Sequence, residues 1–366
     1  MKALVVAGAR PNFMKVAPVL QSLARQGHQR VFVHTGQHYD ASMSDAFFRD
    51  LGLPHPDFHL GVGSASHAKQ TARVMEAFEP VLEESKPDWV VVVGDVNSTI
   101  ACALVASKLT ERLGCRIAHV EAGLRSNDWA MPEEVNRVLT DRLSHLLLTP
   151  SRDAEPNLLR EGIEPSRIVF VGNVMIDSLL HMLPKAEALD VPQRLGVGTG
   201  PYAIATLHRP SNVDHREQLE TILSALAALS RELPVLLPLH PRTRERARAF
   251  GMESLLAGLR VLEPLGYTEM LGLQARASVI LTDSGGIQEE STVLGVPCVT
   301  LRESTERPVT VTEGTNRLAP WPLDTARILE VAHAALAEGR APVGARAPEG
   351  WDGHAGERIV AALASH

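Results

Sequence analysis

The fold is decided by Trp89-Val90-Val91-Val92-Val93-Gly94-Asp95. The apolar residues of this stretch are continuous rather than alternating, and the run stops at a glycine and an aspartate. Continuous apolar strands are typical of parallel sheets that helices cover on both faces. The stretch therefore predicts a parallel α/β sheet with the Asp95 carboxylate at the carboxyl end of one strand.

Similar runs recur through the chain of 366 residues, each ending in a polar or glycine-rich cluster and followed by a helix-like segment. This length suits two domains. We expect an α/β protein of two Rossmann-like, doubly wound parallel-sheet domains facing a cleft. The expected strands are residues 3–7, 31–34, 89–93, 117–120, 146–148 and 168–171, then 203–206, 235–239, 260–262, 279–282 and 298–301.

Residues 183–201 interrupt the alternation with three prolines and three glycines. Such a stretch, after a helix over residues 174–182, indicates a connection between domains. The predicted domains are residues 1–173 and residues 174–353.

Composition narrows the choice of partners and compartment. A net charge of −7 and a pI near 6.1 argue against nucleic acid and against an anionic membrane. No apolar run reaches the roughly 18 residues of a membrane span. Cys102, Cys115 and Cys298 have no metal-type spacing and are too few for a disulfide framework. We expect a cytoplasmic protein with no nucleic-acid and no membrane partner.

Polar side chains gather where the expected strands end. Ligands of doubly wound sheets bind at the carboxyl ends of the strands, so this clustering predicts one active site between the domains. The residues are Arg10, residues 34–38, Asp95, Glu121, Arg125, His208, Arg209, His240 and residues 283–286.

The strongest local signal is Thr282-Asp283-Ser284-Gly285-Gly286-Ile287-Gln288-Glu289-Glu290. Its glycines let a ligand approach the backbone where a helix begins, and the free N–H groups and helix dipole there favour a diphosphate. Glu290 lies four residues after Gly286 on the same helical face, so its carboxylate can reach ribose hydroxyls. The structural alternative is that Asp283 and Ser284 only cap the helix.

A second helix start follows the first strand at Arg10-Pro11, since proline suits the first helical position. Arg10 and Lys15 can then place positive charge over a phosphate, although an exposed, solvated side chain is the alternative for Lys15.

Two motifs that are missing from the sequence limit the reaction types to be considered. No Gly-x-Gly-x-x-Gly follows a strand, and no Asp-x-Asp is present to hold a metal, so neither a redox cofactor nor a metal is expected. His34 and His38 are four residues apart, but a strand end is a poor setting for a metal pair. Asp95, Glu121 and Glu133 remain as candidates for acid–base exchange. The Pro-Glu-Glu setting of Glu133 is also an ordinary helix opening.

A series of motifs spans essentially the whole chain. The most specific are His119-Val120-Glu121-Ala122-Gly123-Leu124-Arg125 and Ser284-Gly285-Gly286. The others are Gly8-Ala9-Arg10-Pro11, Gly94-Asp95, Pro132-Glu133-Glu134 with Asn136-Arg137, His208-Arg209, Thr305-Glu306-Arg307-Pro308, Trp351-Asp352-Gly353 and Arg358-Ile359. In this order they resemble the non-hydrolysing UDP-N-acetylglucosamine 2-epimerases.

The resemblance implies a glycosyltransferase-B-like fold, a homodimer, a UDP-sugar substrate in the cleft of a UDP-binding second domain, and no redox cofactor. It also implies that a C-terminal helix, residues 354–366, crosses back to the first domain. The implied reaction removes the C2 proton as UDP leaves C1, and UDP then re-adds to a 2-acetamidoglucal intermediate as a proton returns to the opposite face.

The resemblance also assigns roles to residues. It makes Asp95, Glu121 and Glu133 the acid–base set and lets His208 stabilise charge on the departing phosphate. The substrate-binding residues it implies are Arg10, Lys15, Ser284, Gly285 and Gly286 for the diphosphate and sugar, Glu290 for the ribose, Arg307 for the sugar side, and Leu265 and Met270 for the uracil loop.

Three alternatives stay open. A hydrolysing 2-epimerase would release free sugar and UDP, a glycosyltransferase of the same architecture would pass the sugar to an acceptor, and a sensor would bind without turnover. Ala9 and Asn12, and the segment 126–131, depart from the commoner family pattern, so the substituents on the hexosamine stay undetermined.

Overall fold

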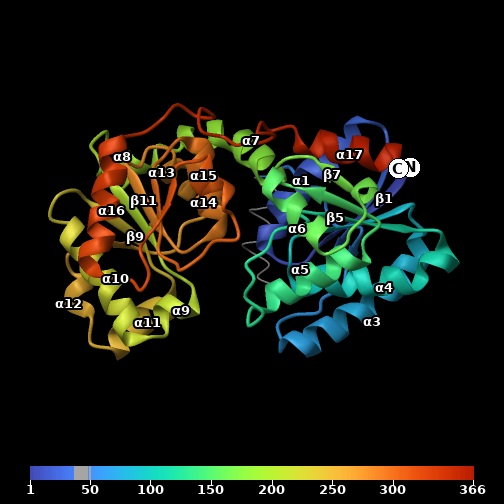
Figure 1. Ribbon diagram of the computed structural model, residues 1–366, viewed down its shortest axis with the longest axis horizontal. Coiled ribbons are helices and arrows are strands. Elements are labelled where there is room, and N and C mark those ends of the chain that lie inside the picture. The colour runs from blue at the N-terminus through green and yellow to red at the C-terminus, as the bar shows by residue number, and fades with distance from the viewer. Residues whose placement is uncertain (37–47, 49–50) are drawn as a thin grey trace. The chain divides into compact units, whose positions relative to one another are not determined.

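A computed structural model of the protein describes residues 1–36, 48 and 51–366 (Figure 1). The chain divides into two compact units. The first comprises Met1–His181 and Glu349–His366, and the second comprises Met182–Pro348. Each unit is a parallel sheet flanked by helices, which confirms the predicted α/β class.

The first unit contains a seven-stranded sheet in the order β3-β2-β1-β4-β5-β6-β7. All the strand pairs in it are parallel. The strands are β1 (Lys2–Ala7), β2 (Gln29–His34), β3 (Phe58–His59), β4 (Trp89–Val93), β5 (Arg116–Val120), β6 (Leu146–Thr149) and β7 (Ile168–Phe170). Its helices include α1 (Arg10–Arg25), α3 (His67–Ser85), α4 (Asn97–Leu113), α5 (Pro132–Leu143), α6 (Glu155–Arg160) and α17 (Ala355–Ser365). The helix α7 (Val174–Ala188) begins in this unit, and its last residues belong to the second.

Helices cover both faces of this sheet (Figure 1). On one face α3 and α4 bury Val74, Phe78 and Val105 against alternate residues of β1 and β4, such as Leu4 and Val90. The apolar runs are continuous because the remaining strand residues face helices on the other side.

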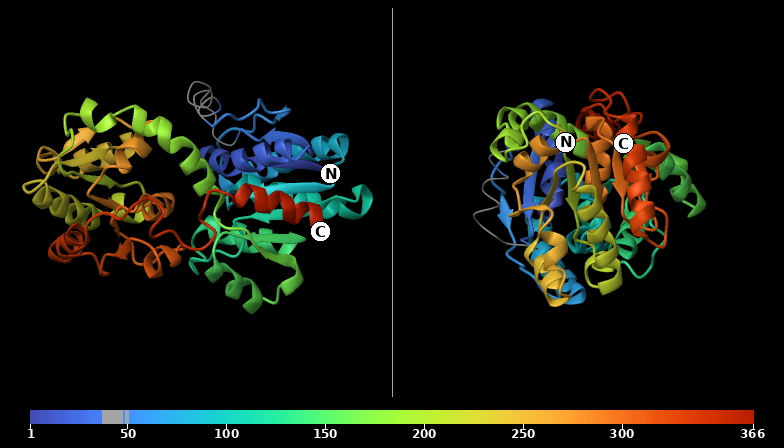
Figure 2. Two further views of the ribbon diagram at one scale, coloured as in Figure 1. Left: turned by 90° about the horizontal axis from the view of Figure 1, so that it is seen from above. Right: turned by 90° about the vertical axis from the view of Figure 1, so that its left-hand side faces the viewer.

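The helix α17 packs against α1 on the first unit (Figure 2). Its first turn is held by Asp177, whose carboxylate accepts hydrogen bonds from the amides of Ala355 and Gly356 at 3.1 and 2.7 Å. A Cβ on Gly356 would lie 2.8 Å from the Pro18 carbonyl oxygen, so only glycine allows this close approach. The indole of Trp89 donates to the Leu363 carbonyl at 3.0 Å, which ties the helix to β4.

The second unit contains a six-stranded sheet in the order β10-β9-β8-β11-β12-β13. Its core is shared by the sheet and by α10 and α16, which pack on each other. The strands are β8 (Ala203–Thr206), β9 (Val235–Pro238), β10 (Arg260–Leu262), β11 (Val279–Thr282), β12 (Cys298–Thr300) and β13 (Asn316–Leu318). The helices are α8 (Val191–Arg194), α9 (Pro210–Val213), α10 (Arg216–Leu229), α11 (Pro241–Ala249), α12 (Glu253–Leu256), α13 (Tyr267–Gln274), α14 (Gly285–Leu294), α15 (Val309–Thr312) and α16 (Thr325–Glu338).

The helix α7 ends later than the sequence predicts. The helix expected over residues 174–182 continues to Ala188 as α7, with Pro184 inside it. A proline removes one helical hydrogen bond, and here the buried side chains of Leu183 and Ala186 hold the helix on both sides of it. None of the helices in the described ranges has both the length and the apolar character to cross a bilayer.

Candidate active site

Each sheet has one point where the order of its strands reverses, and the polar residues gather there. In the first unit the chain runs outward from β1 to β3 and then returns to β4, next to β1. In the second it runs from β8 to β10 and returns to β11, next to β8. Ligands of doubly wound sheets bind outside such switch points. Arg10 and Asp95 follow the first pair of strands, and His208 and Ser284 follow the second.

Glu121 follows β5 in a conformation that is unusual for a residue with a side chain. Its φ is 72°, in the left-handed region, and strain of this kind is concentrated at functional sites. The carboxylate is buried and forms an ion pair with the equally buried Lys15 of α1. A Cβ on Gly94 would lie 2.8 Å from Lys15 Nζ and 3.3 Å from Glu121 Oε2, so glycine at this position makes room for the pair.

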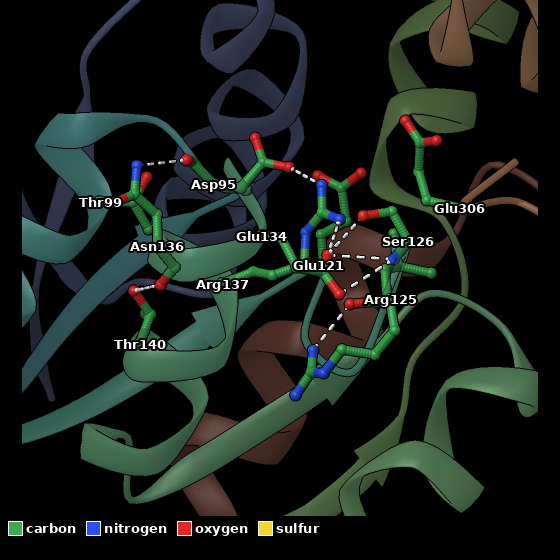
Figure 3. Close-up of polar contacts among 12 residues, drawn as sticks. Asp95, Thr99, Glu121, Arg125, Ser126, Glu134, Asn136, Arg137, Thr140 and Glu306 are labelled. Carbon is green, nitrogen blue, oxygen red and sulfur yellow. Dashed lines mark hydrogen bonds and ion pairs between the residues drawn. The ribbon is translucent and has the colours of Figure 1, made fainter. Parts of the chain in front are cut away.

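Asp95 is held by a buried arginine of α5 (Figure 3). Arg137 pairs with the half-buried Asp95 carboxylate through one guanidinium nitrogen and with Glu134 through another, the latter at 2.5 Å. Asn136 donates to the Asp95 carbonyl at 2.9 Å, so both the backbone and the side chain of Asp95 are fixed. Glu134 in turn accepts from the amides of Ser126 and Asn127.

These contacts keep Glu134 ionised. Burial alone favours the neutral form, but the amides of Ser126 and Asn127 and the charge of Arg137 outweigh it, so the pKa of Glu134 is lowered. The carboxylate therefore anchors the segment 126–131 to α5.

A second buried network lies beneath the 121–125 turn. His119 is fully buried, with Nδ1 2.6 Å from Asp141 and Nε2 2.8 Å from the Gly94 carbonyl. Asp141 also accepts from the Gly123 amide at 3.1 Å and pairs with Arg125 at 2.7 Å. The network therefore joins the loop that follows β4 to the loop that follows β5.

Glu133 lies beside Glu134 in the first turn of α5 but is only half-buried, and its carboxylate has no hydrogen bond or ion pair with the described residues. Arg10 is the first residue of α1, and nothing is described of its side chain. His34 is buried against Phe13, and burial, with a smaller contribution from the charge of His59, lowers its pKa to about 4. His38 lies outside the described residues.

In the second unit, His208 and Asp283 lie next to each other because β8 and β11 are paired with Thr206 opposite Thr282. Asp283 is fully buried and accepts from the His208 amide at 3.1 Å and the Arg209 amide at 3.0 Å. Its Oδ1 lies 2.7 Å from His208 Nδ1, while the His208 side chain is 55% exposed.

The start of α14 is surrounded by arginines. Gly285 and Gly286 are partly accessible in the first turn, and a Cβ on Gly285 would lie 3.2 Å from Glu306 Oε1. The buried Glu306 pairs with Arg302 at 2.8 Å and with Arg209 at 3.2 Å. Arg307 lies 3.9 Å from Glu306 and 2.7 Å from the Glu289 carboxylate.

This arginine cluster sets the charge of Glu306. Burial favours the neutral form, but the charges of Arg307, Arg302 and Arg209 outweigh it and lower the pKa of Glu306 to about 2. Three arginines beside a helix N-terminus make this end of α14 suited to an anion with several charges.

Glu290 lies one turn further along α14 and is buried. Its carboxylate accepts from Gln274 at 2.7 Å and interacts with the Tyr267 hydroxyl, and both partners come from α13. Burial raises the pKa of Glu290 to about 7, although these hydrogen bonds act in the opposite direction. Met270 lies on the same short helix and Leu265 just before it, both half-buried.

Glu290→Gln is expected to stabilise the protein above neutral pH. A folded-state pKa near 7 exceeds the ordinary value of 4.5, so ionisation of Glu290 opposes folding as the pH rises from 4.5 to 7. Glutamine keeps the hydrogen bond from Gln274 and removes this cost of about 3 kcal/mol at pH 8. Thermal unfolding at pH 5 and pH 8 measures the effect. The exposed Glu253→Gln is the control, and an equal gain at both pH values would contradict the assignment.

The structure thus brings Asp95, Glu121 and Lys15 to one switch point, and His208, Ser284, Gly285, Gly286 and Arg307 to the other. The sequence placed Asp283 and Arg209 at the predicted site, but it did not show which partners hold the other residues in position. These partners are Arg137 and Glu134 for Asp95, Asp283 for His208, Arg209, Arg302 and Glu306 at α14, and Tyr267 and Gln274 for Glu290. Arg137 and Asp283 lie inside the motifs named in the sequence analysis, and this position was the sequence feature that could have pointed to them.

Comparison with known proteins decides the family. A sequence model described as UDP-N-acetylglucosamine 2-epimerase matches residues 21–364. The chain belongs to the UDP-N-acetylglucosamine 2-epimerase family. This membership confirms the resemblance seen in the motifs.

Two relatives and one solved structure illustrate the family. A UDP-N-acetylglucosamine 2-epimerase of Methanocaldococcus jannaschii is 43% identical over 326 residues, which are 87% of this chain and 88% of that protein. A UDP-2,3-diacetamido-2,3-dideoxy-D-glucuronate 2-epimerase of Pseudomonas aeruginosa is 44% identical over 322 residues, with coverage of 87% and 88%. The crystal structure of the Methanocaldococcus jannaschii UDP-GlcNAc 2-epimerase in complex with UDP-GlcNAc and UDP has a TM-score of 0.87 at 40% identity and covers 100% of both chains. The fold is thus that of the family, which is glycosyltransferase-B-like.

Proposed function

We propose that this chain is a non-hydrolysing 2-epimerase of a UDP-N-acetylhexosamine, which eliminates UDP and adds it back. The observation that carries the proposal is the pair of carboxylates at the first switch point, Glu121 in its left-handed conformation against Lys15 and Asp95 against Arg137. Binding a doubly negative ligand gains nothing from two carboxylates, whereas proton exchange needs positioned acid–base groups, and carboxylates can fill that role.

The chemistry answers a specific difficulty. The C2–H bond of a hexosamine is a very weak acid unless its cleavage is coupled to the departure of a leaving group. In the proposed step the C2–H electron pair forms the C1=C2 double bond, and the C1–O pair leaves with UDP. UDP then re-adds at C1 of the 2-acetamidoglucal while a proton is delivered to the opposite face of C2. Asp95, Glu121 and Glu133 are the proposed proton carriers.

The second unit supplies the proposed nucleotide site. The N-terminus of α14, with Ser284, Gly285, Gly286 and Arg307, fits a diphosphate by charge. Glu290 is proposed to accept from the ribose hydroxyls, Leu265 and Met270 to border the uracil, and His208 to meet the charge on the leaving phosphate. Arg10 and Lys15 of the first unit are proposed to bind the same substrate.

The hexosamine itself has two candidates. The two relatives at 43% and 44% identity carry names with different substrates, UDP-N-acetylglucosamine and a diacetamido glucuronate derivative. We propose UDP-N-acetylglucosamine first, and turnover of the derivative alone would replace it. The chain is further proposed to act as a cytoplasmic homodimer, which light scattering of the purified protein tests for the oligomeric state.

The decisive test is NMR of UDP-N-acetylglucosamine incubated with the protein in D₂O, with EDTA and without added NAD. The expected product is UDP-N-acetylmannosamine with deuterium at C2 in both epimers, because the proton on C2 exchanges with solvent in each direction. Free sugar with UDP would instead indicate a hydrolysing enzyme. Epimerisation without deuterium would contradict the elimination route.

Gly285→Val should weaken UDP binding by about tenfold or more, while thermal stability changes little. A Cβ there meets Glu306 at 3.2 Å, and a branched side chain also covers the first amides of α14. Calorimetric titration with UDP measures the effect. Gly258→Val, at an exposed position before β10, is the matched control. Unchanged UDP affinity in the Gly285 variant would remove the diphosphate from this helix.

A further inference from the structure

We propose that Asp283 is the positioning residue of His208, fixing its tautomer and aiming Nε2 at the diphosphate that leaves C1. This inference rests on the proposed function and adds a residue to it. Asp283 touches no substrate in this proposal and acts only through the imidazole.

The geometry fixes the protonation of one ring nitrogen. An ionised carboxylate only accepts hydrogen bonds, so His208 Nδ1, 2.7 Å from Asp283 Oδ1, must carry a proton. The remaining nitrogen, Nε2, has no hydrogen-bond partner among the described residues, and the His208 side chain as a whole is 55% exposed. In the imidazolium form Nε2–H then donates to a phosphate oxygen, while the buried carboxylate balances the positive charge.

The surroundings keep Asp283 charged and immobile. Besides the amides of His208 and Arg209, the side chain of Asn212 donates to Oδ2 at 3.2 Å. Burial favours the neutral acid, but the hydrogen bond and charge of His208 and these amides outweigh it, and the pKa of Asp283 is lowered. A group that is fully buried and held by four donors cannot turn away from the imidazole.

A purely structural role is the competing explanation, since the same carboxylate caps the backbone where α9 begins. The two roles differ in what Asp283→Asn changes. If Asp283 only supports the turn, the variant loses stability without changing the state of the ring. If it positions His208, an amide NH₂ facing Nδ1 favours the opposite tautomer, with the proton on Nε2.

The first measurement is ¹⁵N NMR of histidine-labelled protein, with the His208 signals assigned by their loss in His208→Asn. Wild-type protein should show the Nδ1–H tautomer in its neutral form, and Asp283→Asn should show Nε2–H. An Nε2–H tautomer in the wild type overturns the proposal without any Asp283 variant. This readout does not depend on epimerisation, so a wild-type protein that fails to epimerise refutes the proposed function and leaves the Asp283 assignment decidable.

The second measurement is a double-mutant cycle on kcat. Asp283→Asn and His208→Asn should each lower kcat by roughly 10²-fold with KM changed only a few-fold, and the double variant should be no slower than the slower single one. Effects that multiply would overturn the proposal. Asp177→Asn is the matched control, because its carboxylate also caps two backbone amides but contacts no imidazole of the described residues, so kcat should be unchanged. An equal loss of kcat in this control would attribute the effect to stability and overturn the proposal as well.

Discussion

Glu121→Gln is expected to slow epimerisation by about 10²–10⁴-fold while UDP affinity changes little. Glutamine keeps the size of the side chain but removes the basic oxygen that pairs with Lys15. Steady-state kinetics with UDP-N-acetylglucosamine and calorimetry with UDP separate the two quantities. Asp95→Asn should behave in the same way, because at least two groups must share proton transfer on the two faces of C2.

The matched control is Glu111→Gln on the exposed side of α4, which should leave kcat unchanged. If Glu121→Gln retained wild-type turnover, Glu121 would be no proton carrier. Glu133→Gln distinguishes a catalytic role for Glu133 from a structural role at the start of α5. Loss of turnover at unchanged stability supports catalysis, and loss of stability with full turnover makes the residue structural.

Arg137→Met is expected to destabilise the first unit by about 3–5 kcal/mol, the usual cost of leaving buried charges without their partner. Two carboxylates lose their counter-charge at once, because Arg137 pairs with both Asp95 and Glu134. The kcat should fall as well, since Asp95 loses the contact that orients it. Denaturant unfolding followed by the combined fluorescence of the four tryptophans measures the first effect.

Arg112→Met provides the control, because Arg112 pairs with Glu83 where both side chains are exposed. Pairs of this kind contribute little, so its unfolding transition should barely move. An equal loss in the free energy of unfolding of the two variants would show that the buried ion pairs of Arg137 contribute no more to stability than an exposed pair.

The sheets could be predicted from the sequence because their strands are continuous apolar runs. Two strands were missed, β3 with only Phe58 and His59, and β13 with Asn316-Arg317-Leu318. Both strands are short and contain polar residues, so neither forms a continuous apolar run in the sequence. The helix before Pro184 was predicted to end too early, because the rule that proline ends a helix is local and does not include the packing that holds the helix together.

Much of the candidate site followed from the rule that polar residues after parallel strands meet at one edge. This rule located Asp95, Glu121 and His208 by chain position alone. It could not reveal the ion pairs, which depend on side-chain directions and on residues far apart in sequence. Glu133 and Glu134 show the difference, because adjacent residues point about 100° apart around a helix and only the second is buried by the segment 126–131.

The docking of α17 on α1 has a consequence for how the protein is made. The first unit needs residues from both Met1–His181 and Glu349–His366, so it is completed only after the whole of Met182–Pro348 has been translated. At about 5–20 residues per second this takes on the order of 10–30 s on the ribosome. The second unit is contiguous, so its last residue is made before the first unit is complete, while the α17-facing side of α1 waits uncovered. Nascent chains should therefore become protease-resistant in the second unit first, reversing the order in which the two units begin to emerge.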